Sequence, residues 1–229
     1  MGRLGRLLTR ASAAEDERVG ILRERGIGVV LDVGANEGLY AAGLRARGYR
    51  GRIVSLEPLR EAFAKLERTA HGDERWECLN TALGARPGTA TLNVAGNWAS
   101  SSLLPMDARL PRIEPRTAYV GTEECTVETL DDLRPRLLRE EERALLKVDV
   151  QGFELEVLRG AEQTLRQVDV VEIELSLATL YTGAPSAEEV MRHLEGRGFS
   201  LQSKEPAFRD PQTGEVLQVD ATFVRGQPR

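Results

Sequence analysis

The chain has 229 residues and a mass of 25.3 kDa, and its 31 Lys and Arg residues against 36 Asp and Glu residues give a formal net charge of −5. Its 41% hydrophobic and 29% charged residues are enough to bury a core, which excludes a disordered chain. The acidic balance lacks the basic face that a general nucleic-acid-binding protein needs, so no nucleic-acid partner is expected.

Targeting and membrane signals do not stand out in the sequence. No stretch approaches 18 apolar residues, and the first ten residues have a basic start without the apolar run of a signal peptide. Cys78 and Cys125 are the only cysteines, too few for a disulfide scaffold or a zinc cluster. We therefore expect a cytoplasmic protein without a transmembrane segment.

The first predicted unit is a helical segment over residues 1–25. Its residues Leu4, Leu7, Leu8 and Ala11 lie on one stripe of a helix, flanked by arginines. The stripe predicts a helix that packs on its own domain or on a second copy of the chain, and the second case gives a homodimer. A helix lying on a membrane surface is the alternative.

Residues 26–229 form the predicted main domain, in which short apolar runs alternate with helical spacing. The runs expected to be strands buried on both faces are 29–33, 52–56, 76–79, 145–150 and 168–175. The segments with helical spacing are 39–47, 59–70 and 153–165. Strand, helix and strand in this order predict right-handed crossovers and an α/β fold, a doubly wound and mostly parallel sheet with helices on both sides.

Two regions interrupt this alternation. Residues 84–128 contain several glycines and prolines, two β-like runs and a serine-rich loop, and an insertion of this length predicts a lid or a wall over a site. The tail has the pattern of a helix over 187–196 followed by strands at 199–203 and 216–224, with a turn at 210–214. It predicts an antiparallel hairpin at the edge of the sheet.

A glycine-bearing turn follows the first predicted strand and predicts a nucleotide-cofactor site. Gly34 and Gly38 allow close backbone approach, and the following helix offers free N–H groups. Glu57, at the end of the second strand, is placed to bind both hydroxyls of a ribose. Asp32 and Glu37 flank the turn, and their charges disfavour the pyrophosphate of NAD or FAD. They favour S-adenosylmethionine, which carries an ammonium and a sulfonium.

Two carboxylates are the candidates for catalysis. Asp149 ends the fourth predicted strand and Glu174 the fifth, at the edge where open α/β sheets bind ligands. Asp149 is expected to act as general base or to orient an acceptor hydroxyl. Alternatively, Asp149 and Glu174 hold Mg²⁺. A third reading has Asp149 capping the helix that begins near Gly152.

Five segments together resemble the FkbM family of S-adenosylmethionine-dependent methyltransferases. They are 30–38 (VLDVGANEG), 80–84 (NTALG), 100–103 (SSSL), 129–133 (TLDDL) and, most specifically, 146–161 (LKVDVQGFELEVLRGA). The common family form has Glu where this chain has Gln151. The resemblance implies a Rossmann-like class I methyltransferase fold closed by the C-terminal hairpin.

The resemblance also implies site residues. Asp32, Gly34, Ala35 and Asn36 would face the methionine moiety of the cofactor, and Glu57 its ribose. The residues beside the adenine would be Thr81 and Ala82, and those closing over the cofactor Ser101 and Ser102.

The implied reaction is methylation of a hydroxyl on a sugar, a glycan precursor or a natural product, so a small molecule or a glycan is the expected partner. Methylation of a nitrogen or a carboxylate is the first alternative. A catalytically silent cofactor-binding scaffold of a biosynthetic complex is the second.

Overall fold

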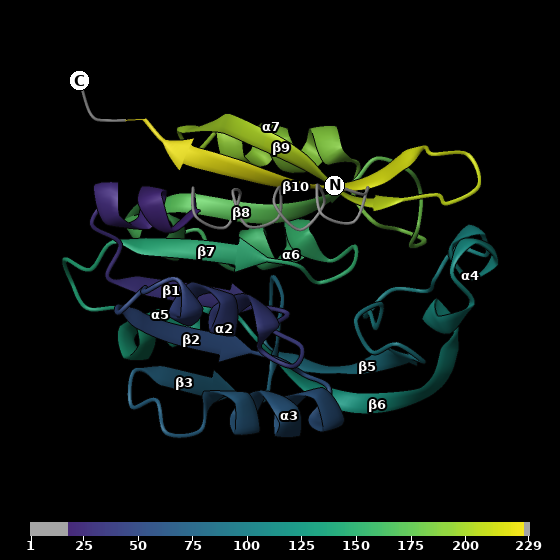
Figure 1. Ribbon diagram of the computed structural model, residues 1–229, viewed down its shortest axis with the longest axis horizontal. Helices are drawn as coiled ribbons and strands as arrows, with labels where there is room; N and C mark the ends of the chain where they lie inside the picture. Colours follow the sequence, from purple (N-terminus) through teal and green to yellow (C-terminus); the bar gives the residue numbers. More distant parts are fainter. Residues whose placement is uncertain (1–17, 227–229) are drawn as a thin grey trace, which may run out of the picture.

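The computed structural model describes residues 18–226, which are built around a seven-stranded sheet. In spatial order its strands are β3 (Trp76–Leu79), β2 (Arg52–Leu56), β1 (Val29–Val33), β7 (Ala144–Val148), β8 (Val168–Ser176), β10 (Val216–Arg225) and β9 (Phe199–Arg209). Figure 1 shows this order from one edge of the sheet to the other. Residues 1–17, where most of the expected N-terminal helix falls, lie outside the described part, and residues 18–24 are helical.

The sheet is mostly parallel, as the alternation of elements predicted. β1 pairs in parallel with both β2 and β7, and β7 pairs in parallel with β8. β10 is antiparallel to both of its neighbours, β8 and β9. The antiparallel C-terminal hairpin is thus confirmed, with one refinement: the antiparallel strand lies between β8 and β9, and β9 forms the edge.

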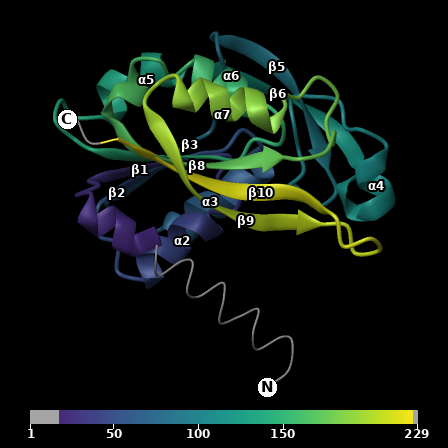
Figure 2. The ribbon, with the colours of Figure 1, turned by 90° about the horizontal axis from the view of Figure 1, so that it is seen from above.

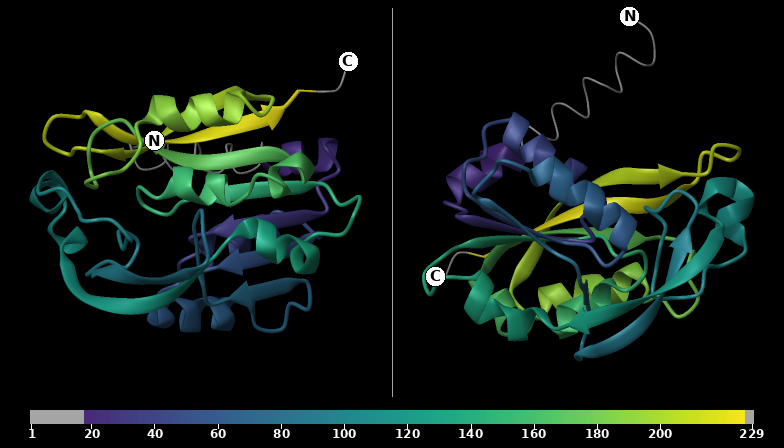
Figure 3. Two further views of the ribbon diagram at one scale, coloured as in Figure 1. Left: turned by 180° about the vertical axis from the view of Figure 1, so that it is seen from behind. Right: turned by 90° about the horizontal axis from the view of Figure 1, so that it is seen from below.

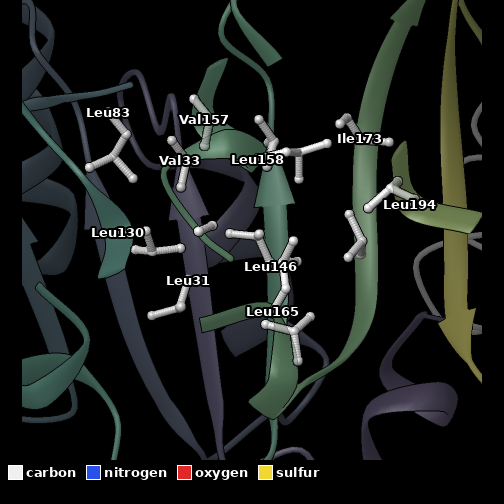
Figure 4. Packing of buried hydrophobic residues seen from close by; sticks show 14 of the residues in the cluster. Leu31, Val33, Leu83, Leu130, Leu146, Val157, Leu158, Leu165, Ile173 and Leu194 are labelled. Atoms are coloured by element: carbon white, nitrogen blue, oxygen red, sulfur yellow. The ribbon is translucent and has the colours of Figure 1, made fainter. Parts of the chain in front are cut away.

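Helices cover both faces of the sheet, which gives three layers (Figure 2). One face carries residues 18–24, α2 (Leu39–Ala46) and α3 (Arg60–Ala70); the other carries α5 (Leu130–Leu137), α6 (Glu154–Arg159) and α7 (Ala187–Glu195) (Figure 3). The core is divided in the same way because neighbouring residues of a strand point to opposite faces. Leu31 and Leu146 pack against α5, α6 and α7 (Figure 4), whereas Val30 and Leu145 pack against α2 and α3.

The predicted insertion contains a small second sheet. β4 (Ala82–Leu83), β6 (Tyr119–Glu128) and β5 (Gly88–Ala95) form it in this order, and α4 (Arg109–Ile113) with a 3-10 turn at Pro115–Thr117 completes the region. These elements lie beyond the carboxyl ends of the parallel strands of the large sheet (Figure 1). The insertion therefore stands at the edge where ligands of open α/β sheets bind.

Two local predictions differ from the structure. The helix expected over 153–165 ends at Arg159, where Gly160 packs so closely on the carbonyl of Gly84 that a Cβ would lie 2.0 Å from that oxygen. A 3-10 turn at Thr164–Gln167 follows. Helix α5 was not predicted, although Thr129 caps it with a side-chain oxygen that accepts the N–H of Asp132. Within residues 18–226, no helix combines the length and the apolar character that crossing a membrane requires.

Candidate active site

The turn after β1 is shaped by Gly34, which has a positive φ of 75°. A Cβ on this residue would lie 1.9 Å from the carbonyl oxygen of Asp149, at the end of β7. The N–H of Gly34 donates to the carbonyl of Leu56 over 3.0 Å. Only glycine allows this turn to pack between the ends of β2 and β7.

Glu57 joins this turn to the end of β2. Its Oε2 accepts the N–H of Asn36 and its Oε1 accepts the N–H of Leu59, both over 2.8 Å. The residue is 7% exposed. Burial raises the pKa of Glu57 to about 7, although the two backbone N–H groups favour the charged form. The carboxyl group is therefore fixed in place and titrates near neutral pH.

A cavity of about 680 Å³, counting the part open to solvent, lies beyond these turns and is called the main cavity. The predicted site residues that line it are Gly34, Asn36, Glu57, Thr81, Ala82, Ser101, Ser102 and Asp149. Pro58, Leu92 and Phe153 add apolar surface. This mixture of apolar walls with a few polar groups is typical of small-molecule sites.

The insertion contributes one wall of the main cavity through the loop 97–103. Trp98 lines the cavity, and the ammonium of Lys65 lies 4.2 Å from the centre of its ring. Lys65 is held in turn by Glu37 over 2.7 Å. The Ser102 hydroxyl donates to the carbonyl of Gln151 over 2.7 Å, which ties this loop to the turn after β7. The lid predicted for 84–128 thus has at least one segment in contact with the cavity.

A row of polar residues crosses the sheet beside this cavity. Four neighbouring strands contribute one residue each, and each residue is the register partner of the next: Ser55 on β2, Asp32 on β1, Lys147 on β7 and Glu172 on β8. Oδ2 of Asp32 accepts the Ser55 hydroxyl over 3.1 Å, and its Oδ1 lies 3.5 Å from Nζ of Lys147.

Burial raises the pKa of Asp32, and Lys147 opposes this rise. For Lys147, burial lowers the pKa, but Asp149 and Asp32 outweigh it and the net shift is upward. Lys147 is therefore a buried cation held by two carboxylates.

The structure places Asp32 and Ala35 differently from the other predicted cofactor residues. Asp32 is fully buried and does not line the main cavity, so it contacts Lys147 rather than facing a ligand. Ala35 lines a smaller adjoining cavity together with Tyr40, Lys147 and Asp149. A contact between Asp32 and the methionine moiety stays a prediction.

Asp149 occupies the centre of the site. It lines the main cavity, the smaller cavity beside Ala35, and a third cavity on the side of β8 and β10. Its Oδ1 accepts an N–H of Gln151 over 2.8 Å, and its Oδ2 lies 3.4 Å from Nζ of Lys147.

Asp149 does not cap α6. The buried Glu154 instead accepts the N–H groups of Val150 and Gly152, over 3.2 and 3.0 Å. Glu154 therefore stabilises the turn that carries Asp149, in addition to placing an acidic group in the first turn of α6.

The third cavity, called the acidic cavity, is lined by Asp149, Glu172, Glu174 and Asp220 together with Arg18, Tyr40 and Lys147. Arg18 forms two hydrogen bonds to Glu172, over 2.7 and 2.8 Å. Among the residues that the structure describes, Glu174 and Asp220 form no ion pair. Burial and the charge of Asp149 raise the pKa of Glu174 well above its usual range and that of Asp220 to about 6.

Gln151 separates the two predicted catalytic carboxylates. Its Nε2 donates to Oδ1 of Asp149 and to Oε2 of Glu174, each over 2.8 Å. Oε2 of Glu174 also accepts an N–H of Gln218. In the described part of the chain, no group of three His, Cys, Asp or Glu side chains has an arrangement that could hold a metal ion. Because N–H donors occupy the facing oxygens, this donor set does not fit a Mg²⁺ ion between Asp149 and Glu174.

Some residues of this site were not predicted from the sequence as site residues. Lys147 had a signal, because a lysine inside a buried apolar strand needs a carboxylate partner. The sequence signal for Gln218 is weaker, because a glutamine within β10 is an ordinary core or surface residue until the chain is folded.

Comparisons with known proteins agree with this arrangement. Residues 32–201 match the model of the Methyltransferase FkbM domain family. The fold is similar to magnesium protoporphyrin IX methyltransferase from Synechocystis PCC 6803 with bound SAM, at 12% identity and a TM-score of 0.51, over 93% of this chain and 79% of that chain.

The same enzyme with bound SAH gives 11% identity, a TM-score of 0.51, and 93% and 83% coverage of the two chains. A ribosomal protein L11 methylase from Lactobacillus delbrueckii subsp. bulgaricus is matched at 11% identity and a TM-score of 0.49, with 96% and 79% coverage. None of the curated proteins compared with the chain matches it.

The two matches with a TM-score of 0.51 confirm the class I methyltransferase fold. The family match covers most of the chain and includes the glycine turn, Asp149 and Glu174. The chain therefore belongs to the FkbM methyltransferase domain family and is a SAM-dependent methyltransferase.

Proposed function

We propose that this enzyme transfers a methyl group from S-adenosylmethionine to a hydroxyl of a neutral, polyhydroxylated acceptor, such as a sugar, a glycan precursor or a natural product. The observation that carries the proposal is the position of Asp149, which lines both the main cavity and the acidic cavity. One carboxylate therefore borders the two spaces that a cofactor and an acceptor would occupy.

We assign the cofactor to the main cavity. Glu57 would accept the ribose hydroxyls, and Gly34 and Asn36 would contact the methionine moiety beside Asp149. Oδ1 of Asn36 is buried and has no hydrogen-bond partner among residues 18–226, so it is available to a ligand donor. Thr81 and Ala82 would flank the adenine, with Ser101 and Ser102 in the covering loop. Asp32 would act indirectly, by holding the ammonium group of Lys147 in position.

The chemistry requires a nucleophilic oxygen and an acceptor for its proton. When bound, S-adenosylmethionine supplies a methyl group on a sulfonium, a good leaving group. The acceptor oxygen would take this methyl group as the S–CH₃ bond breaks, and Asp149 would accept the hydroxyl proton and pass it to solvent. The products are a methyl ether and S-adenosylhomocysteine. Lys147 and Gln151 hold Asp149 in one orientation, which favours near-attack alignment.

The acidic cavity favours a neutral or cationic acceptor. Arg18 is engaged by Glu172, and Lys147 by Asp32 and Asp149, so Glu174 and Asp220 remain without an ion-pair partner in the described chain. Asp220, with a pKa of about 6, is ionised at neutral pH and repels a phosphate or a carboxylate, whereas Glu174, whose raised pKa favours the protonated form, exchanges hydrogen bonds with sugar hydroxyls. No step of this mechanism passes through a metal, because the donor set between Asp149 and Glu174 does not fit Mg²⁺.

We also propose a reducing compartment such as the cytoplasm, because Cys78 and Cys125 are both free thiols. A homodimer formed through residues 1–25 stays a prediction, which light scattering coupled to size-exclusion chromatography would test.

The test of the function is a methyl-transfer assay with radiolabelled S-adenosylmethionine. The acceptors would be matched pairs of glycosides and glycosylated metabolites, each offered with and without a phosphate or a carboxylate. We expect a labelled product from neutral members only, with the label stable to mild base as an ether is. A base-labile ester, a methylated amine, or transfer to the anionic members only would contradict the proposal.

Asp149→Asn is the variant that tests the catalytic assignment. It should lower transfer by about 10²- to 10⁴-fold, the usual effect of losing a general base, while binding of S-adenosylhomocysteine stays within about threefold. The matched control is Glu156→Gln, a carboxylate-to-amide change on the following helix, where Glu156 pairs with Arg159 outside the site. Equal activity of Asp149→Asn and the control would show that Asp149 is not the general base.

A further inference from the structure

Tyr181 connects two parts of the site that are far apart in the sequence. Its side chain is fully buried, and its hydroxyl lies 2.8 Å from Oε1 of Gln151 and 3.1 Å from the carbonyl oxygen of Ser100. Ser100 belongs to the loop 97–103, which forms a wall of the main cavity, and Gln151 belongs to the turn that carries Asp149. One hydroxyl therefore touches both the covering loop and the catalytic turn.

Gln151 extends this connection to the carboxylates. Both of its amide hydrogens are used, one on Asp149 and one on Glu174, and its amide oxygen accepts the Tyr181 hydroxyl. A flipped amide would place its oxygen against the facing oxygens of Asp149 and Glu174. The two carboxyl groups therefore favour one orientation of the Gln151 side chain.

The backbone makes room for this arrangement. Gln151 has a positive φ of 55°, which is rare for a residue other than glycine and which a surrounding structure must enforce. At the next residue, Gly152, a Cβ would lie 3.1 Å from Cβ of Tyr181 and 3.3 Å from Cδ1 of Leu104. Ser102 adds a second link, because its hydroxyl donates to the carbonyl of Gln151. The catalytic turn is thus packed directly against the tyrosine and the covering loop.

We propose that Tyr181 and Gln151 form a positioning relay that couples the loop 97–103 over the main cavity to the carboxylates Asp149 and Glu174. The two residues do not take part in the chemistry. They orient the carboxylates when the loop is in place, so closure over the cofactor and alignment of the base occur together. The relay rests on the proposed placement of the cofactor in the main cavity.

The near end of the relay is tested by Tyr181→Phe, which keeps the ring and removes the hydroxyl. Hydrogen exchange of the amides of Ser101, Ser102 and Leu104 is the first readout, measured without ligand. We expect exchange to rise by about threefold to tenfold, the effect of one lost hydrogen bond. Tyr49→Phe is the matched control, because the buried Tyr49 hydroxyl donates to the carbonyl of Ile27, away from the loop and the relay. Equal exchange at Ser101 and Ser102 in the two variants would overturn the proposal.

The far end is tested by Glu174→Leu, since Glu174 has no described contact with the loop. Coupling through Gln151 predicts faster exchange at Ser101 and Ser102 in this variant and unchanged exchange in Asp220→Leu, which alters the same cavity outside the relay. A purely local role of Gln151 predicts no change at the loop in either variant, and that result would refute the relay.

Non-additivity distinguishes a relay from two independent structural contacts. Tyr181→Phe and Gln151→Leu should each weaken binding of S-adenosylhomocysteine in isothermal titration by about threefold to tenfold, and the double variant by no more than the larger single effect. Additive losses would contradict the proposal.

If Gln151→Leu does not fold, Gln151→Glu replaces it, because a glutamate keeps the oxygen that Tyr181 binds and loses both donors. Loop exchange should then rise as it does in Glu174→Leu, and exchange at the wild-type rate would contradict the relay.

The two proposals fail in different ways. Absence of binding of S-adenosylhomocysteine to the wild-type protein would contradict the proposed cofactor site and leave the exchange measurements to decide the relay. Unchanged exchange in Tyr181→Phe beside normal binding would refute the relay and leave the proposed function intact.

Discussion

The ammonium nitrogen of Lys147 lies 3.4 Å from a carboxylate oxygen of Asp149, and on its other side it faces Asp32 at 3.5 Å. The lysine side chain is 13% exposed, and Asp32 is fully buried. This cation therefore serves two purposes: it compensates a buried charge within the sheet and fixes the proposed base at the surface of the cavity.

Replacing Lys147 by Met should destabilise the protein by about 3–5 kcal/mol, because it leaves the Asp32 carboxylate buried and uncompensated. Urea denaturation at neutral pH measures this. The double variant Lys147→Met with Asp32→Asn should recover most of the loss, since the amide carries no charge. A cost below about 1 kcal/mol for the single variant would show that water, rather than Lys147, compensates Asp32.

Binding of S-adenosylhomocysteine should strengthen as the pH rises. The pKa of Glu57 is raised to about 7, so the group is mostly protonated at pH 6 and mostly ionised at pH 8. Ribose hydroxyls donate to the ionised form, so binding releases a proton, and affinity should rise about tenfold between these two pH values. Isothermal titration across the range gives the measurement. The rise should disappear in Glu57→Gln, and its persistence there would assign the titration to another group.

The same shift fixes the pH dependence of stability in the absence of ligand. A carboxyl whose pKa is higher in the folded than in the unfolded state binds more protons when folded. The contribution of Glu57 to the free energy of unfolding should therefore fall as the pH rises from about 4.5 to about 7. Thermal unfolding with and without saturating S-adenosylhomocysteine tests this: the ligand should remove the decline by stabilising the charged form.

Gly34→Ala should be far more costly than an equivalent change elsewhere. Its Cβ would lie 1.9 Å from the carbonyl oxygen of Asp149, in addition to the penalty of a positive φ. We expect a loss of about 3 kcal/mol or more and no detectable cofactor binding. Gly72→Ala is the control, because its φ is +83° and a Cβ there meets no atom within 4 Å. That variant should lose only about 1–2 kcal/mol. Similar costs for the two would mean that the turn after β1 relaxes.

Removal of divalent ions should leave methyl transfer within about twofold of the untreated rate. The oxygens of Asp149 and Glu174 that face each other are already bound to the amide of Gln151. The measurement is the radiolabel assay after treatment with EDTA, followed by addition of Mg²⁺. A loss of activity that Mg²⁺ restores would show that an ion displaces the amide in the working complex.

Much of the architecture could be predicted from the sequence, because it depends on local patterns. Apolar runs separated by helical spacing specify strands and crossovers, and parallel strands bring their carboxyl ends to one edge. The sequence therefore placed Asp149 and Glu174 together without any coordinates, and it placed Glu57 beside the glycine turn. The segment 146–161 was specific enough to identify the family.

Other features depend on contacts between distant segments, which no local pattern encodes. The register of β1 against β7 decides that Asp32 meets Lys147 and stays out of the main cavity. Helix α5 is short and contains Pro135, so its signal was weak. The contacts among Tyr181, Gln151 and Ser100 join three loops that meet only when the sheet and the insertion have folded.

The sequence by itself determined the fold class, the family and the position of the two carboxylates proposed for catalysis, because hydrophobic periodicity and contiguous motifs are properties of neighbouring residues. Only the tertiary structure decided which carboxylate lines a cavity, which is paired with a cation and which shares an amide. Those outcomes are set by burial and by hydrogen-bond partners from other strands and loops, and both are defined only after the chain has packed.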